Sequence, residues 1–228
     1  MTVTATREEA PTDTTAGSRG LRTVLLALIG IGLLLLGGAL AVAFGIGRDA
    51  PPAADSVDVG FARDMSAHHL QAVEMANLAL QNSTDDAVRG LAFDIAETQQ
   101  NQVGRMQGWL SLWGHSITGG EQMAWMSTGE HAGHDMSSMG EGPMPGMASD
   151  EELAELRSAT GEDFDVLFLQ LMTRHHQGGL DMAEHAEANA REPAVRTLAR
   201  TIAESQTGET ELMVSMLSER GAEPLPAP

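Results

Sequence analysis

The 228-residue chain contains no cysteine, no tyrosine and no lysine, and the missing cysteine excludes several kinds of site. Without thiols we expect no disulfide, no zinc–thiolate site, no cysteine nucleophile and no lipid-modified cysteine anchor. All 13 basic side chains are arginine, against 32 acidic ones, which gives a net charge of −19. Such a surface repels nucleic acid and anionic lipid headgroups, so DNA or RNA binding is not expected. It suits cations and basic partners, although solubility alone also explains it.

Aromatic residues are scarce as well, at 4% of the chain, whereas apolar residues reach 42%. The apolar fraction is high enough for a real core. Because that core must be built mainly from Ala, Leu and Met, which are good helix formers, the composition indicates packed helices.

One long uncharged segment, residues 23–47, is dense in Leu, Ile, Val, Ala and Gly. At about 1.5 Å per residue, a helix of this length crosses a hydrocarbon core of about 30 Å. Arg19 and Arg22 precede the segment, whereas Arg48 and Asp49 cancel at its end. The positive-inside rule then places residues 1–22, which we expect to be a disordered tail, in the cytoplasm. The remainder of the chain lies outside.

A cleaved signal peptide is the alternative to this membrane anchor. Residues 41–43, Ala-Val-Ala, have the small-x-small form of a cleavage site. The apolar segment is longer than most signal cores, which favours an uncleaved, single-pass anchor. Both alternatives place the main domain outside the cytoplasm, as a membrane-bound or a secreted protein.

The rest of the chain contains a duplication. When the sequence is shifted by 107 residues, 19 of the 50 positions 61–110 are identical to their counterparts, without a gap. Each copy predicts two helices with apolar residues at helical spacing. In the first pair, the first helix ends near residues 82–84 and the second ends near Trp113. The second covers about 163–190 and, from Pro193 in its first turn, about 193–220.

Two hairpins of long helices, each with one apolar stripe, bury those stripes best against each other. The sequence therefore predicts an all-α four-helix bundle over residues 58–220, preceded by the transmembrane helix and a linker at 48–57. The first hairpin covers 58–113 and the second 151–220, with a short additional helix at 151–158. Residues 114–150 form an irregular crossover, and 221–228 a tail.

The first candidate metal site is a Met-x-x-His-His motif that occurs once in each copy. Residues three or four positions apart share a helix face, so the methionine stands beside a histidine. Imidazole and thioether groups bind Cu(I) and Ag(I), and imidazole also suits Cu(II) and Zn(II). The alternative is a pair of core histidines that hydrogen-bond across a pseudo-two-fold axis. The candidate ligands are Met65, His68 and His69, with their copies Met172, His175 and His176.

Carboxylates and further methionines are secondary candidates. Glu97 and Glu204 are equivalent positions, as are Met75 and Met182. Bundle metal sites often combine Glu and His from facing helices, but the Glu-x-x-His spacing of di-iron bundles is absent. The alternative for these acids, and for the equivalent pair Glu74 and Asp181, is surface charge or pairing with Arg89 and Arg196.

The crossover holds eight further soft donors within 25 residues, on a segment that is too polar and Gly-rich for a core. A flexible Met/His tract captures Cu(I) where thiols would be oxidised, and the alternative is a disordered loop. The donors are Met123, Met126, His131, His134, Met136, Met139, Met144 and Met147, of which His131, His134, Met136 and Met139 are the strongest candidates.

The doubled pattern begins at Phe61 and Phe168 and continues through the paired histidines to Met75-Ala76 and Met182-Ala183. This pattern resembles the bacterial domain-of-unknown-function family 305. The resemblance covers about residues 58–220. It implies a ferritin-like four-helix fold and copper binding of the kind described for some periplasmic members, with the two Met-His-His sets as the functional positions. The second copy has Gly178-Gly179 in place of Gln71-Ala72, which we expect to loosen the helix after His176 and to make the copies unequal.

Three hypotheses follow. The leading one is an extracytoplasmic protein that binds or buffers copper, as Cu(I) or Cu(II), or silver, in metal homeostasis or resistance. The second is a ferritin-like metal-dependent oxidase that uses Glu97 and Glu204, against which the missing Glu-x-x-His spacing counts. The third is a metal-free envelope module whose acidic surface binds a protein partner or a second copy. Binding is favoured over catalysis.

Overall fold

The structure, a computed structural model, describes residues 15–45, 50–127 and 144–228. These residues form α-helices and one short 3-10 helix and contain no strand, which confirms the predicted all-α class. The chain divides into two compact units, Met1–Ala50 and Pro51–Pro228, and each is described by itself.

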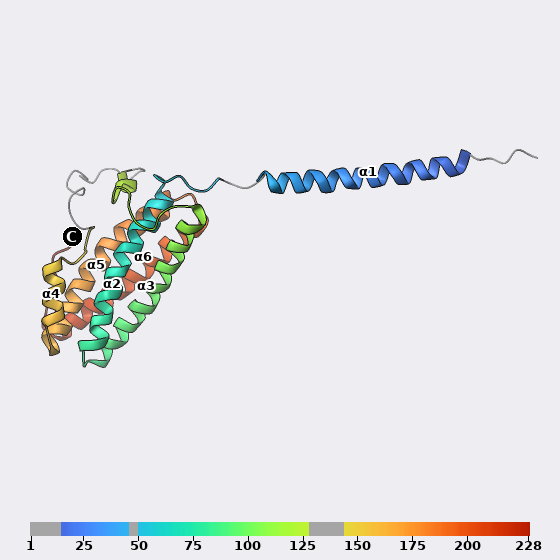
Figure 1. Cartoon of the computed structure of the whole chain (residues 1–228). Coiled ribbons are helices and arrows are strands. Elements are labelled where there is room, and N and C mark those ends of the chain that lie inside the picture. Colours follow the sequence, from blue (N-terminus) through green and yellow to red (C-terminus); the bar gives the residue numbers. More distant parts are fainter. Residues whose placement is uncertain (1–14, 46–49, 128–143) are drawn as a thin grey trace, which may run out of the picture. The chain divides into compact units, whose positions relative to one another are not determined.

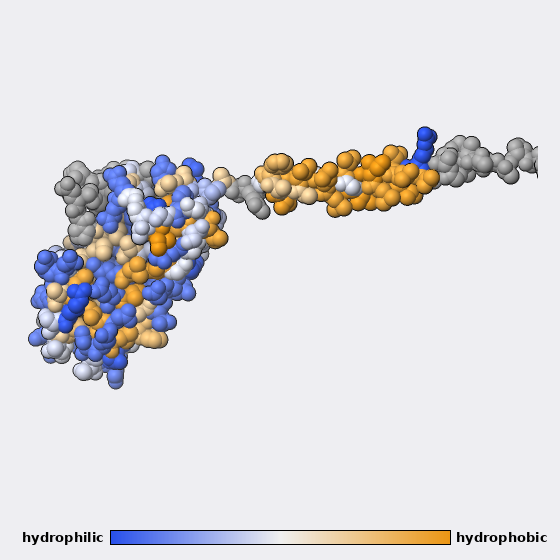
Figure 2. All heavy atoms as spheres, viewed as in Figure 1, coloured by the Kyte–Doolittle hydropathy of each residue, from blue (hydrophilic) through white to orange (hydrophobic). Residues whose placement is uncertain are grey.

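The N-terminal unit contains helix α1, Thr15–Ala43. Its segment Gly20–Ala43 is the one helix among the described residues that is long and apolar enough to cross a membrane. The leucines along it are exposed, and Figure 2 shows the orange, hydrophobic colour over nearly all of its visible surface. The helix begins within the segment expected to be disordered. It ends before Gly45, whose φ of 66° breaks the helical pattern earlier than the predicted residue 47.

The second unit is the predicted four-helix bundle (Figure 1). Helices α2 (Val57–Asn82) and α3 (Asp86–Trp113) form the first hairpin, and α5 (Gly161–Asn189) and α6 (Pro193–Glu219) form the second. The hairpins are joined mainly where α2 packs against α5. The short helix α4, Asp150–Ser158, packs on α2 and α5.

Local sequence signals set the helix ends. Asp85 caps α3 by accepting hydrogen bonds from the backbone N–H groups of Ala87 and Val88, at 2.8 and 3.1 Å. At its other end, Gly114 adopts the left-handed conformation, with φ 77°. Pro193 occupies the first turn of α6, as predicted.

The two equivalent arginines cap helices instead of pairing with acids. Arg89 donates hydrogen bonds to the carbonyl oxygens of Leu80 and Ser83, at the end of α2. Arg196 donates to those of Ala190 and Arg191, at 2.8 and 2.6 Å, at the end of α5. Of the two alternatives given for the candidate carboxylates, pairing with these arginines is therefore wrong, whereas surface charge agrees with the exposure of Glu97 and Glu204. Helix C-termini carry unsatisfied carbonyls, which a guanidinium group satisfies well.

Two apolar clusters fill the bundle, and each takes residues from both hairpins. The 107-residue shift maps the main members of one cluster onto those of the other, so the bundle has an approximate two-fold symmetry. The first apolar cluster includes Met75, Ile95, Phe168 and Met213, and the second includes their counterparts Met182, Ile202, Phe61 and Met106.

The start and end of the crossover contribute to the second cluster, although the sequence indicated a segment too polar for a core. Met123 and Met144 are buried there, and Met126 and Met147 pack against it. The 3-10 helix η1, Ala124–Ser127, is held by Asp64, whose carboxylate accepts from the Met123 N–H and the Trp125 Nε1–H, both at 2.8 Å. A Cβ at Gly60 would lie 2.4 Å from the Trp125 ring, so glycine is required beneath it.

Candidate functional site

A polar layer crosses the middle of the bundle, between the two apolar clusters. On α2, Met65 belongs to the second cluster and Ala72 to the first, with His68 and His69 between them. Each of the other three helices also contributes to one cluster before its polar residues and to the other cluster after them. Their polar pairs are Gln99 and Gln102 on α3, His175 and His176 on α5, and Gln206 and Glu209 on α6.

The four histidines of this layer form a row across the bundle, and all four are fully buried. At its centre, the rings of His68 and His175 face each other across the α2–α5 contact, with centroids 3.8 Å apart. His69 lies 6.5 Å from His68, and His176 lies 6.3 Å from His175, measured between ring centroids. Adjacent residues on a helix diverge by about 100°, so one ring of each pair lies in the α2–α5 contact and the other lies on a flank of that helix pair. In the structure the flanks are covered by α3 and α6.

Hydrogen bonds fix which nitrogen of each ring carries the proton. His68 Nε2 lies 3.0 Å from the Pro145 carbonyl oxygen, and His175 Nε2 lies 3.1 Å from that of His68. A carbonyl oxygen accepts and does not donate, so both Nε2 atoms carry hydrogen. In the same way His69 Nε2 donates to the Gln102 amide oxygen at 2.8 Å, and His176 Nε2 to the Glu209 carboxylate at 2.6 Å.

The other nitrogen of each ring, Nδ1, is buried and has no hydrogen-bond partner. Burial disfavours the charged imidazolium, which lowers the pKa of His68 to about 4 and that of His69 to about 3, and that of His175 well below its ordinary value. These three rings are therefore neutral at pH 7, each with an unshared Nδ1 lone pair. That is the protonation state in which imidazole binds metal.

Two glutamines complete the layer and were not identified as site residues from the sequence. Gln99 and Gln206 are buried, and neither the oxygen nor the nitrogen of either amide has a hydrogen-bond partner. Unpaired buried polar atoms are rare in folded proteins and call for an explanation such as a bound ion. A signal was present, because both glutamines interrupt an apolar stripe at equivalent positions of the duplication.

The end of the crossover covers His68 and depends on glycine. A Cβ at Gly178 would lie 2.1 Å from the Pro145 carbonyl oxygen, and one at Gly146, whose φ is 78°, would lie 2.4 Å from that of Arg174. Gln71 exchanges two hydrogen bonds with the backbone of Ala148, at 2.9 and 2.7 Å. Helix α5 continues unbroken through Gly178, so the expected loosening is wrong. Glycine is there because backbone approaches backbone.

Gly178→Ala is expected to destabilise the bundle by about 1–3 kcal/mol, the usual cost of inserting a methyl group into a filled space. Gly208→Ala on α6 is the matched control, because a Cβ there meets nothing within 4 Å and alanine favours the helix. Urea unfolding of both variants measures the difference. Equal stabilities for the two variants would contradict the tight contact.

The other candidate ligands lie outside the polar layer: the methionines are in the apolar clusters on either side of it, and the carboxylates are on the surface. Met65 and Met182 are buried in the second apolar cluster, and Met75 and Met172 in the first. Glu97 and Glu204 lie exposed on α3 and α6, and Glu204 is 4.0 Å from Arg200. Glu74 pairs with Arg157, and Asp181 is exposed. The strongest crossover candidates, His131, His134, Met136 and Met139, lie outside the described residues.

The donor set of the layer fits some metals better than others. Among the described residues, no three His, Asp or Glu side chains are grouped as a metal site. The layer thus lacks the four-ligand set of structural zinc. It offers imidazole nitrogens, with a thioether three residues before each pair, and these donors suit soft copper or silver ions.

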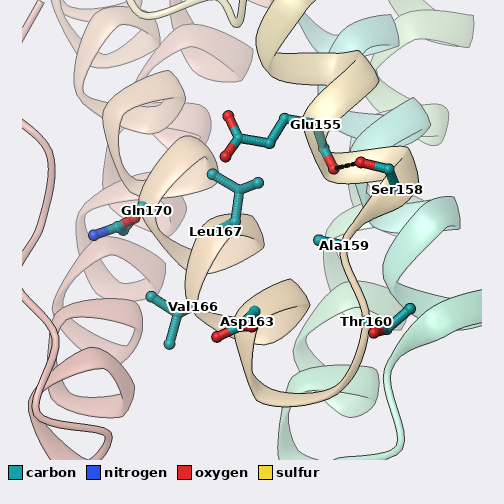
Figure 3. Close-up of a pocket in the computed structure, with 8 residues that line it drawn as sticks. All are labelled: Glu155, Ser158, Ala159, Thr160, Asp163, Val166, Leu167 and Gln170. Carbon is teal, nitrogen blue, oxygen red and sulfur yellow. Dashed lines mark hydrogen bonds between the residues drawn. The ribbon is translucent and has the colours of Figure 1, made fainter.

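A surface pocket lies elsewhere, between the end of α4 and the beginning of α5 (Figure 3). The residues around it include Glu155, Asp163, Leu167 and Gln170, and none of them is a histidine or methionine. It is therefore separate from the candidate metal chemistry.

Comparison with known proteins agrees with this description. The chain is 43% identical to a DUF305 protein from Streptomyces coelicolor, with TM-score 0.68 and 76% and 99% of the two chains covered. It is 34% identical to a DUF305 fragment from Deinococcus radiodurans, with TM-score 0.58 and coverage of 72% and 96%. CopM in its Cu(II)-bound form is 28% identical, with TM-score 0.55 and coverage of 72% and 97%, and its Cu(I)-bound form is 26% identical, with TM-score 0.53 and coverage of 71% and 96%.

None of the curated proteins compared with the chain matches it. The family model described as a domain of unknown function, DUF305, matches residues 58–217, the duplicated bundle with its doubled histidine motif. The chain therefore belongs to the DUF305 family.

Proposed function

We propose that the chain is an extracytoplasmic copper-binding protein, also able to bind silver, that buffers the metal through the buried histidine row and is held at the membrane by α1. The observation that carries the proposal is the set of four buried Nδ1 atoms without hydrogen-bond partners. Each ring donates its Nε2–H to an oxygen, which is the usual arrangement of a metal-binding histidine.

The relatives and the membrane segment support the same proposal. CopM, which shares the fold, is described in Cu(II)- and Cu(I)-bound forms. The apolar helix α1 fits a signal anchor or a signal peptide, and either places the bundle outside the cytoplasm. The net charge of −19 attracts cations to that surface.

The proposed ligands are the Nδ1 atoms of His68, His69, His175 and His176, with the thioethers of Met65 and Met172. The Met/His tract around His131 and Met139 is proposed as a second, weaker capture site. Buried imidazole and thioether groups hold copper without thiols, which suits an oxidising compartment.

Competition with a Cu(I) chelator tests the proposal on the full chain in detergent. Loss of an outer-shell partner alone costs roughly 10- to 100-fold in metal affinity, so changing all four histidines to alanine is expected to weaken binding by at least about 100-fold. A four-histidine variant that binds Cu(I) as tightly as the wild type would refute the proposal.

Met65→Leu combined with Met172→Leu tests the thioethers separately. Leucine conserves the volume, so stability should change by less than about 1.5 kcal/mol per site. We expect Cu(I) affinity to fall by about tenfold, because leucine offers no lone pair. The same chelator competition, with Met106→Leu as the core control, measures it. Unchanged affinity would show that these methionines serve packing alone.

A further inference from the structure

The two ends of the histidine row are built alike but carry different charge. His69 and Gln102 are 33 residues apart, and so are their copies His176 and Glu209. In both pairs the imidazole Nε2–H donates to the side chain on the neighbouring helix, at 2.8 and 2.6 Å. The acceptor is a neutral amide in the first copy and a carboxylate in the second.

The carboxylate of Glu209 is directed to its histidine. In the part of the chain that the structure describes, the ion pair of Glu209 is with His176, and no arginine lies within salt-bridge distance. The Glu209 side chain is 20% exposed, whereas that of His176 is fully buried. Its negative charge is therefore poorly shielded from an ion bound at the far nitrogen of the ring.

A fixed negative charge behind a ligand acts unequally on the two oxidation states of copper. The attraction is proportional to the charge of the ion, so it is twice as large for Cu(II) as for Cu(I) at the same distance. A carboxylate partner also makes the imidazole more electron-rich, which again favours the more highly charged ion. An amide partner orients the ring without adding charge.

We infer that Glu209 is a specificity-determining residue that makes the His176 end of the row prefer Cu(II), whereas the His69 end, backed by neutral Gln102, prefers the monovalent ions Cu(I) and Ag(I). The inference rests on the proposed function and extends it to the oxidation state of the metal. It makes the duplicated chain a binder with two unequal ends.

Glu209→Gln converts the second end into the first, and it is tested in the full chain in detergent. All chains in this series also carry H131S, H134S, M136S and M139S, so that the crossover tract does not compete for copper. Dissociation constants for Cu(I) and Cu(II) are measured separately with chelators of known affinity. We expect Cu(II) binding to weaken roughly 10- to 100-fold, and Cu(I) binding by less than about threefold. The copper midpoint potential then rises by about 30–120 mV, at 59 mV per tenfold change in the ratio of the two dissociation constants.

Two further variants separate this effect from general loss of charge or of fold. Glu211→Gln removes an exposed carboxylate from the same helix and should leave both affinities unchanged. Gln102→Glu, the reciprocal change, should tighten Cu(II) binding at the first end, with helical content by circular dichroism as the folding control.

The outcomes distinguish this inference from the proposed function. A wild-type chain that binds neither ion would overturn both. A wild type that binds copper, with Glu209→Gln weakening Cu(I) and Cu(II) equally, would overturn the inference alone, as would Glu211→Gln giving the same shift. A selective loss of Cu(II) binding and a raised midpoint potential in Glu209→Gln alone would support it.

Discussion

The metal-free bundle should lose most of its stability between pH 7 and pH 5. His68, His69 and His175 have folded-state pKa values below the 6.5 of an unfolded histidine, because burial disfavours their charged forms. As the pH falls below 6.5, these three histidines bind protons in the unfolded chain but stay unprotonated in the folded chain. Each ring then lowers the free energy of unfolding by about 1.4 kcal/mol per pH unit. Three rings over 1.5 pH units cost on the order of 6 kcal/mol, comparable with the whole stability of many domains.

The other groups with shifted pKa values do not reverse this loss of stability at low pH. Burial raises the pKa of Asp64, which opposes the loss but involves one group. The pKa values of Asp85 and Glu152 are lowered chiefly by a hydrogen bond, from the Val88 N–H and from Arg174 respectively, so their contributions are lost only below the ordinary pKa values of 3.8 and 4.5. Urea unfolding in the presence of a metal chelator, at pH 7.5, 6.5, 5.5 and 5, measures the slope. A free energy of unfolding that stays flat over this range would contradict the neutrality of the three buried rings.

Replacing the two central histidines by leucine should abolish tight copper binding and, at the same time, stabilise the metal-free bundle. His68→Leu with His175→Leu removes two unpaired Nδ1 atoms, each of which costs about 1–3 kcal/mol. The hydrogen bonds that are lost are worth about 0.5–1.5 kcal/mol each. We therefore expect a net gain of about 1–3 kcal/mol at pH 7.5, and Cu(I) affinity at least about 100-fold lower, since two ligands are gone.

The same double variant also tests the pH prediction, because only His69 remains of the three histidines whose pKa values are lowered. The slope of stability against pH between 6.5 and 5 should fall to about one third. Denaturant unfolding and Cu(I) competition on the same preparation give both results. A large loss of stability in the double variant would mean that the central rings are structural and not a metal site.

Most of the fold could be predicted because its signals are local or repeated. The apolar stripes and Pro193 predicted the helix ends of the bundle to within a few residues. The gapless duplication predicted two matching hairpins, and the structure has them. The ends of α1 were predicted less well, because hydropathy marks where a helix is apolar and not where its backbone bonds stop.

The candidate site could be predicted only in part, because its geometry depends on contacts between distant segments. The Met-His-His motifs identified the histidines, but not that each ring nitrogen would have its own oxygen acceptor. Glu209 lies 33 residues from His176 on another helix, and no spacing rule within one helix links them. Gly178 had to be interpreted without knowing that the Pro145 backbone lies against it. The burial of Met123 likewise depends on Asp64 and on the space left at Gly60.

The shared composition of the two apolar clusters bears on how such a protein arises. Because each cluster draws on both hairpins, one hairpin alone leaves its half of both clusters exposed to water. A single-hairpin ancestor would therefore have been stable only as a homodimer, with a histidine facing its own copy across the dimer axis. Fusion of two such genes makes that dimer permanent at any dilution, and it frees each half to mutate on its own.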